Sequence, residues 1–147
     1  MSSNAWWAYG SELKIGDDGS VTNYTKVAEI IDIGGPKMSR DTIEVTSQDS
    51  ADGYREFISG LKDAGEVNVS ANWLPAAETH DGSTGVLSKF DGDAVTKWQI
   101  ITASDGSGGR LTIAFSAIVT NFNVDLPLEE QAKMDFTLKI TGKPTFS

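Results

Sequence analysis

The sequence predicts a mainly β, antiparallel domain with one short α-helix. Apolar and polar residues alternate along residues 67–73 and again along residues 134–140, which is typical of strands that bury one face. Glycine occurs 15 times in 147 residues, mostly in DG, GG and GS pairs, and this favours short strands joined by tight turns. Helical periodicity is weak throughout the chain.

The first part of the chain is predicted to hold two strands and a long loop. Residues 13–15 form a short leading strand, followed by a turn at residues 16–19, and residues 27–33 form a second strand that ends at a GGP sequence. Residues 34–53 show no strong periodicity. A loop of this length in a compact domain is usually functional or disordered.

The middle of the chain contains the segment whose type the sequence leaves open. Four apolar residues within residues 54–61 fit helical spacing, but so short a run does not distinguish a helical turn from a strand. One short helix is predicted over residues 79–90, with Ser83 as a possible cap and Gly92 as the stop. Gly82 and Gly85 weaken this helix by about 1 kcal/mol each relative to alanine.

The last third is predicted to be a hairpin followed by a further strand. Residues 98–103 form an apolar strand, and glycines in the turn at residues 105–109 can adopt the positive φ values of tight hairpins. In the strand at residues 110–124 the apolar positions change parity near Ser116 and Ala117, which predicts a bulge or bend there. The strand at residues 131–141 completes the domain.

Composition excludes several classes of function. The chain is long enough for one domain, residues 1–147, with its own core. It has no cysteine, so disulfides and thiolate metal sites are absent, and a reducing cytoplasm would suit it. A formal charge of −9 disfavours phosphate-driven binding of nucleic acid. No segment approaches the length of a membrane helix, and no secretion signal is recognisable, so no membrane partner is expected.

No catalytic, metal or cofactor site is predicted, and the chain is therefore not expected to be an enzyme. His80 is the only histidine, and its neighbours Asp81 and Ser83 lack the nucleophile elbow of a hydrolase. The adjacent carboxylates at residues 17–18 and 129–130 are best explained as solvated charge. The acidic segments at residues 49–56 and 91–93 lack the spaced oxygen ligands of a calcium loop.

The four tryptophans fall into two groups. Trp73 and Trp98 lie in predicted strands and are expected in the core or at its margin. Trp6 and Trp7 lie near the N-terminus, where they would either pack against the edge of the sheet or anchor in a neighbouring subunit.

One stretch of the sequence carries a family resemblance. In order, it contains AEIIDIGGP (residues 28–36), SRDTIEVTSQDS (39–50) and REFISGLKDAGEV (55–67), followed by the alternating strand up to Trp73. This order is similar to that of the tail tube (major tail) proteins of long-tailed, lambda-like bacteriophages. The likeness continues more weakly through WQIITAS to GKP at residues 142–144.

The resemblance implies a fold and a way of assembly. The fold would be an antiparallel β-sandwich or partly closed barrel with one short flanking α-helix. Six copies would form a ring, and rings would stack into a hollow tube that conducts DNA during infection. The partners would be further copies of the chain and the tape measure, tail tip and tail terminator proteins. Genomic DNA would pass without specific binding, and no cofactor is implied. The protein would assemble in the host cytoplasm and reside in the virion.

Assembly assigns expected roles to particular residues. Open sheet edges can pair between subunits. The loop at residues 34–53 is expected to become ordered between stacked rings. Its charged residues, which would make the inter-ring contacts, are Lys37, Arg40, Asp41, Glu44, Asp49 and Asp52. Candidates for other subunit contacts are Trp6, Trp7, Tyr54 and Arg55.

The lumen of such a tube should be acidic or neutral, because a ring of basic residues would hold DNA by its phosphates. The strands at residues 110–124 and 131–141 are the candidates for its lining. Lys133, Lys139 and Arg110 would then need acidic neighbours or an outward position.

The sequence is also compatible with two alternatives to a siphophage tail tube. A monomeric β-sandwich binding module, for example for carbohydrate, would use exposed aromatics such as Trp6, Trp7 and Tyr54 to stack on sugar rings. A tube protein of a contractile tail or secretion-type injection system would share the fold. Formation of rings or tubes by the purified protein would decide between assembly and the monomeric module.

Overall fold

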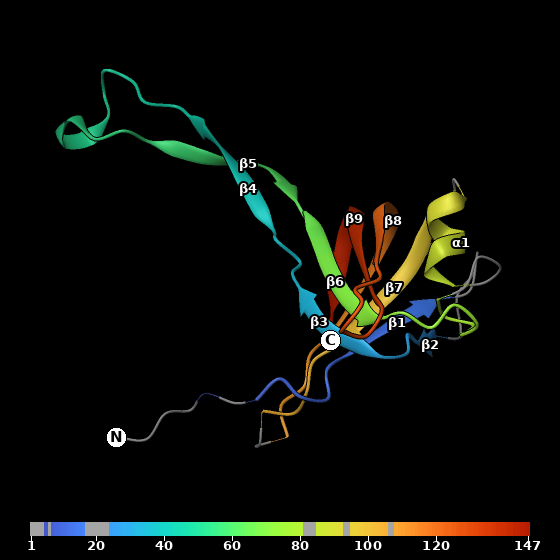
Figure 1. Cartoon of the computed structure of the whole chain (residues 1–147). Helices are drawn as coiled ribbons and strands as arrows, with labels where there is room; N and C mark the ends of the chain where they lie inside the picture. The colour runs from blue at the N-terminus through green and yellow to red at the C-terminus, as the bar shows by residue number, and fades with distance from the viewer. Residues whose placement is uncertain (1–4, 6, 17–23, 81–84, 93–94, 106–107) are drawn as a thin grey trace.

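The computed structural model describes residues 5, 7–16, 24–80, 85–92, 95–105 and 108–147 (Figure 1). In chain order its elements are β1 (Glu12–Gly16), β2 (Tyr24–Lys26), β3 (Ile30–Gly34), β4 (Ser39–Glu44), the 3-10 turn η1 (Ala51–Gly53), β5 (Phe57–Asp63), β6 (Glu66–Asn72), α1 (Val86–Asp91), β7 (Thr96–Ile101), β8 (Thr112–Asp125) and β9 (Lys133–Phe146).

Seven strands form one antiparallel sheet in the order β2-β1-β7-β8-β9-β6-β3, and β4 pairs only with β5. The sheet is open, with β2 and β3 as its edges, but it curls far enough for β3 to approach β1. The predicted fold was a β-sandwich or a partly closed barrel, and the structure shows the partly closed barrel. The predicted single helix, α1, lies beside β8.

The core lies on the inner face of the curled sheet. Trp98 and Phe136 are buried at its centre with their ring centroids 6.2 Å apart. The alternation predicted along residues 67–73 is confirmed, because Val67, Val69 and Ala71 are buried while the intervening side chains are not. Trp73 packs at the margin of this core, as expected from the sequence.

The strands with strong alternation are close to their predicted positions. The leading strand predicted at residues 13–15 is β1, the strand predicted at 67–73 is β6, and the apolar strand predicted at 98–103 is β7, which begins at Thr96. The strand predicted at 131–141 is β9, which extends further, to Phe146. One-sided burial gives these strands a period of two that the sequence displays directly.

Three predictions of element boundaries were wrong. The strand predicted at residues 27–33 is interrupted at Glu29, whose φ of 60° bends the chain, so that β3 begins only at Ile30. The helix begins at Val86 because Gly85 is extended, and Ser83 lies outside the described residues. In β8 the register with β9 shifts between Ala114 and Ser116, close to the predicted bulge, but the burial parity changes only at a second shift, between Val119 and Asn121, and this leaves Ile118 exposed.

The segment predicted as a loop at residues 34–53 contains a strand. β4 occupies its middle and pairs with β5, and this pairing also shows that the ambiguous residues 54–61 include a strand rather than a helix. We call residues 39–63, which comprise β4, η1 and β5, the arm. Figure 1 shows the arm extending away from the seven-stranded sheet.

Candidate assembly surfaces

The arm has no core of its own. Every residue of β4 is exposed, and in β5 every residue except the half-buried Gly60 is exposed. Two strands cannot enclose apolar side chains between them, and an isolated hairpin is at best marginally stable in water. The arm is thus a surface that remains to be covered.

The arm nevertheless carries large apolar side chains. Leu61 is 84% exposed and Tyr54 is 74% exposed, and Ile43 and Ile58 form an exposed cross-strand pair. The others are Val45 and Phe57. Exposed apolar residues gathered on one element mark an interaction site. Of these apolar residues the sequence predicted only Tyr54 as a contact, because the charged residues were the clearer signal in this segment.

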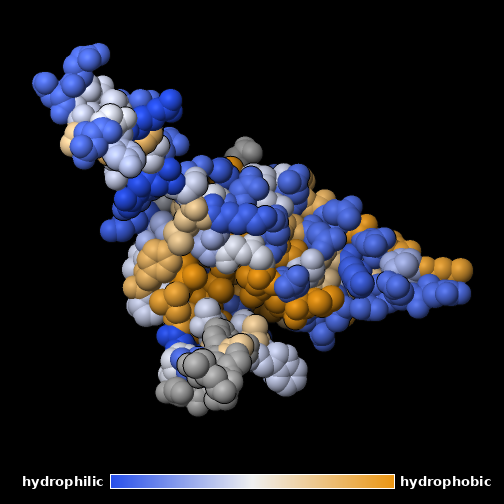
Figure 2. All heavy atoms as spheres, turned by 90° about the vertical axis from the view of Figure 1, so that its left-hand side faces the viewer, coloured by the Kyte–Doolittle hydropathy of each residue, from blue (hydrophilic) through white to orange (hydrophobic). Residues whose placement is uncertain are grey.

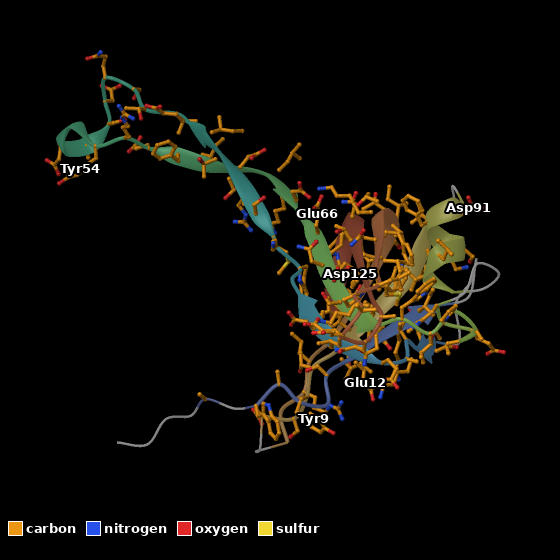
Figure 3. All side chains as sticks on the ribbon, viewed as in Figure 1. Tyr9, Glu12, Tyr54, Glu66, Asp91 and Asp125 are labelled. Atoms are coloured by element: carbon orange, nitrogen blue, oxygen red, sulfur yellow. The ribbon has the colours of Figure 1, made fainter. Side chains whose placement is uncertain are left out.

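The charged residues predicted as assembly contacts are exposed and are distributed along the arm and its base. Figure 3 shows the side chains of the arm, with Tyr54 labelled near its tip. Arg40 donates from Nη1 to Ser59 Oγ at 3.3 Å across the two strands. Asp41 and Glu44 lie on β4, and Lys37 precedes the arm, with its backbone N–H donating to the Glu66 carbonyl at 3.2 Å. The remaining candidates, Asp49, Asp52 and Arg55, lie around the tip with Tyr54.

The tip of the arm is ordered by short-range hydrogen bonds. The Glu56 N–H donates to Thr46 Oγ1 at 2.8 Å, and Ser50 Oγ donates to a Glu56 carboxylate oxygen at 3.0 Å. The Ser47 N–H donates to Ser50 Oγ at 2.9 Å. These bonds fix the shape of the turn without burying it, so the tip is an ordered and exposed surface.

The base of the arm is a close crossing of two chain segments. Gly35 has φ +121° and Gly65 has φ +76°, and a Cβ at Gly65 would collide with the carbonyl oxygen of Lys37. Asp63 Oδ1 accepts the Gly65 N–H at 2.8 Å, and Lys139 Nζ lies 3.6 Å from Asp63 Oδ2. That hydrogen bond, and then the charge of Lys139, lower the pKa of the Asp63 carboxyl below its ordinary value.

The two edges of the sheet offer a different kind of surface. β2 and β3 each pair on one side only, and Ile31 on β3 is 52% exposed. A groove of about 550 Å³ lies between β3 and the N-terminal segment around Tyr9. Unpaired edges of this kind are templates for strands of another chain.

Near this edge, Trp7 is 80% exposed and stacks on Tyr9 with ring centroids 5.1 Å apart. Of its two expected placements, packing against the edge of the sheet is therefore not found for Trp7, and anchoring in a neighbouring subunit stays a prediction. Trp6 lies outside the described residues.

The outer face of β6 and β9 is lined by small polar side chains. Ser70 Oγ donates to Asp135 Oδ1 at 2.6 Å, and Thr137 Oγ1 donates to Asn68 Oδ1 at 2.9 Å. Lys133 lies 3.6 Å from a Glu130 carboxylate oxygen, and Lys139 is paired with Asp63. Both lysines therefore have the acidic neighbours that a DNA-conducting wall would require of them.

The described residues do not assemble a catalytic site. His80 is fully buried: its Nδ1 accepts the Leu74 N–H at 3.1 Å, and its Nε2 lies 2.7 Å from the Ala28 carbonyl oxygen. Both ring nitrogens thus serve the fold, and Asp81 and Ser83 fall outside the described part of the chain. No cluster of potential metal ligands occurs among the residues searched, and no described helix could span a membrane.

The family model described as lambda phage tail tube protein, TTP, matches residues 7–147. The chain belongs to this family. As a family member it is a structural subunit of a phage tail tube and hence part of the virion tail. No curated protein sequence shows significant similarity to it.

Solved structures share the fold at low sequence identity. A chain of the tail of an empty gene transfer agent (GTA) particle, refined with C6 symmetry, superimposes with a TM-score of 0.70 and 18% identity, over 92% of this chain and 94% of that one. A chain from the sheath/tube terminator of an extracellular contractile injection system, PVC, gives a TM-score of 0.71 and 15% identity over 100% and 99%. The SPP1 tail tube gives 0.68 and 9% over 97% and 79%.

Proposed function

We propose that six copies of this tail tube protein form a ring and that rings stack into a hollow tube through which genomic DNA passes. The arm is the inter-ring contact. The observation that carries the proposal is the arm itself, a two-stranded element with exposed apolar side chains and no enclosed core. A partner that covers it gains the burial of apolar area that the single chain leaves in water.

Ring closure is assigned to the edges of the sheet. β2 and β3 both expose backbone groups on one side, so the edge of one copy can pair with an edge of the next. Such a contact is heterologous, because it joins two different surfaces, and it closes into a ring when the rotation per copy divides a full turn. The exposed Trp7 and Tyr9 pair near β3 would contribute to the same boundary.

The polar outer face of β6, β8 and β9 is assigned to the lumen. Its hydroxyl and amide side chains carry no charge, and its two paired lysines are neutralised by Glu130 and Asp63. These two lysines would therefore not add rings of unpaired cations to the wall that DNA meets. A tube structure with a net-positive inner wall would contradict this assignment even if the ring were correct.

The remaining partners follow from the tube. Its ends would contact tail tip and tail terminator proteins, and before DNA passage its lumen would hold the tape measure protein. The tip and terminator proteins would bind the ring surfaces left open at the two ends, and the tape measure protein would contact the lumen wall. No cofactor or separate ligand site is required.

The proposal is tested by reversing a charge on the arm. Arg40→Glu and Asp49→Lys each change an exposed side chain, so the melting temperature should stay close to that of the unchanged protein. Assembly should nevertheless fail, as seen by negative-stain electron microscopy and light scattering. Lys97→Glu is the matched control, since this exposed residue lies on β7 away from the arm.

The possible outcomes separate the alternatives. Tubes from the unchanged protein and from the control, but not from the arm variants, support the proposal. Equal loss of fold and assembly would make the arm a structural element instead. A chain that stays monomeric at high concentration, and also fails to enter tubes in cells that express the other tail proteins, would favour the monomeric binding module.

A further inference from the structure

The turn between β8 and β9 exposes an unusual apolar tip. Leu128 is 99% exposed and Leu126 is 67% exposed, on either side of Pro127. Acidic residues surround them at Asp125, Glu129 and Glu130. We call residues 125–130 the knob. A leucine that is almost completely in water at the end of a long hairpin contributes nothing to the core of its own chain.

A groove with the complementary chemistry lies at the base of the arm. Its volume is about 620 Å³, and its apolar lining includes Met38, Ala64, Pro144 and Phe146. Met38 and Phe146 are 54% and 46% exposed. In Figure 2 hydrophobic atoms, shown in orange, gather on the face below the projecting arm. Apolar surface therefore remains in contact with water beside the arm.

The charge of the groove is basic. Arg40, Lys62 and Lys143 line it, against a single carboxylate, Asp63, which is already paired with Lys139. The knob is acidic, and among the described residues Glu130 is the one of its carboxylates that has an ion pair, with Lys133. The two surfaces are thus complementary in charge as well as in hydrophobicity, a combination that both steers and selects a partner.

Knob and groove belong to opposite ends of one strand. The knob precedes Lys133, where β9 begins, and the groove includes Gly142 and Lys143 near the other end of this strand. At about 3.3 Å per residue, roughly 30 Å of extended chain separates the two surfaces along β9. No knob residue lines the groove of its own chain. Contact between the two surfaces therefore requires two molecules.

We propose that the knob of one copy inserts into the arm-base groove of a second copy, with Leu126 and Leu128 against the apolar lining and Glu129 facing Lys62 and Lys143. This inference rests on the proposed function, because it assigns one subunit contact within the tube. The contact is heterologous: each copy contributes one knob and one groove, so it propagates through the assembly.

Cysteine cross-linking tests where the knob lies. The chain has no cysteine, so single-cysteine variants report on one position each. Tubes assembled from an equal mixture of Leu128→Cys and Met38→Cys chains should yield a covalent dimer on mild oxidation. A mixture of Leu128→Cys with Val95→Cys is the control, because Val95 is similarly exposed, at 53%, but is not part of the groove. Equal cross-linking in both mixtures would overturn the proposal.

A charge swap tests the pairing independently. Lys143→Glu and Glu129→Lys should each slow tube growth about tenfold, comparable to 1.4 kcal/mol of lost interaction, without a change in melting temperature. The double variant should regain most of the rate. Additive loss in the double variant would overturn the proposal.

The unchanged protein separates this inference from the function on which it rests. Normal tubes without the specific cross-link would remove the knob contact and leave the tube intact. Absence of tubes under all conditions would remove the proposed function, and the knob contact with it.

Discussion

The sheet domain and the arm are both built from antiparallel strands, but they differ in whether the apolar side chains of those strands are buried. In the sheet, alternate residues of β6 and β9 are buried against Trp98 and its neighbours. In the arm, both faces of β4 and β5 remain in water although the strands carry isoleucine, phenylalanine and leucine. The sheet is therefore stabilised within one chain, whereas the apolar surface of the arm can be buried only between chains.

This difference predicts that fold and assembly respond to different residues. Substitutions in the sheet should change the free energy of unfolding first, and assembly only as a consequence. Substitutions of arm side chains that leave the backbone conformation unstrained should change assembly while the free energy of unfolding stays nearly constant. Paired variants, one in each region, test whether stability and assembly depend on different residues.

The largest effect is expected from truncation of the central aromatic residue. Trp98→Ala removes a fully buried side chain and should lower the free energy of unfolding by about 3–5 kcal/mol. Phe57→Ala, at an arm position that is 53% exposed, should lower it by less than about 0.5 kcal/mol. Urea unfolding followed by tryptophan fluorescence and circular dichroism measures both. Similar losses would show that the arm is part of the folded core.

The buried histidine provides the next test. His80→Ala leaves the Leu74 N–H and the Ala28 carbonyl without their partner and should cost about 2–4 kcal/mol. Ser59→Ala removes the exposed hydrogen bond to Arg40 and should cost no more than about 0.5 kcal/mol. Thermal melts of both variants check the contrast, and a tolerant His80 position would contradict the structural role assigned to it.

The base of the arm joins the two regions and should show a mixed response. Gly65→Ala places a Cβ against the Lys37 carbonyl at a positive φ, which should cost about 1–3 kcal/mol and also shift the arm. Gly53→Ala, also at positive φ but with open space around it, should cost about 1 kcal/mol. Melting temperatures and tube yields of the Gly65→Ala and Gly53→Ala variants are compared, and Gly65→Ala should give the lower tube yield. Equal tube yields would show that the position of the arm is not fixed at its base.

The smallest effect concerns pH. Because the pKa of Asp63 is lowered in the folded chain, its contribution to stability is present above the ordinary value of 3.8 and is lost as the pH falls through the lowered value. The protection of the Gly65 amide against exchange, measured relative to the intrinsic exchange rate at each pH, should fall over this acidic range, and Asp63→Asn should remove the acid-dependent component. An unchanged pH profile in Asp63→Asn would assign that component to another carboxyl.

The sequence predicted those parts of the fold in which burial imposes a pattern. β6 and β9 were located because every second residue enters the core. β4 was missed because both of its faces are exposed, so no periodicity marks it. The bend at Glu29 was missed because a positive φ at a non-glycine residue has no clear sequence signal.

The candidate contact surfaces were predicted less completely. Charged residues of the arm could be named because polar residues stand out in a segment without periodicity. The apolar contacts around Leu61 and the groove beside Phe146 depend on which residues the fold leaves uncovered. That property is set by long-range pairing of β5, β6 and β9, which local sequence does not specify.

Hydrogen–deuterium exchange of the freshly purified chain and of the assembled tube measures whether a neighbouring copy covers the arm. Peptides from the arm should exchange rapidly in the free chain and become protected by about tenfold or more in the tube, because a neighbouring copy then covers them. Peptides from β6 and β9 should be protected in both states. Arm peptides that exchange equally fast before and after assembly would contradict the assignment of the arm as the inter-ring contact.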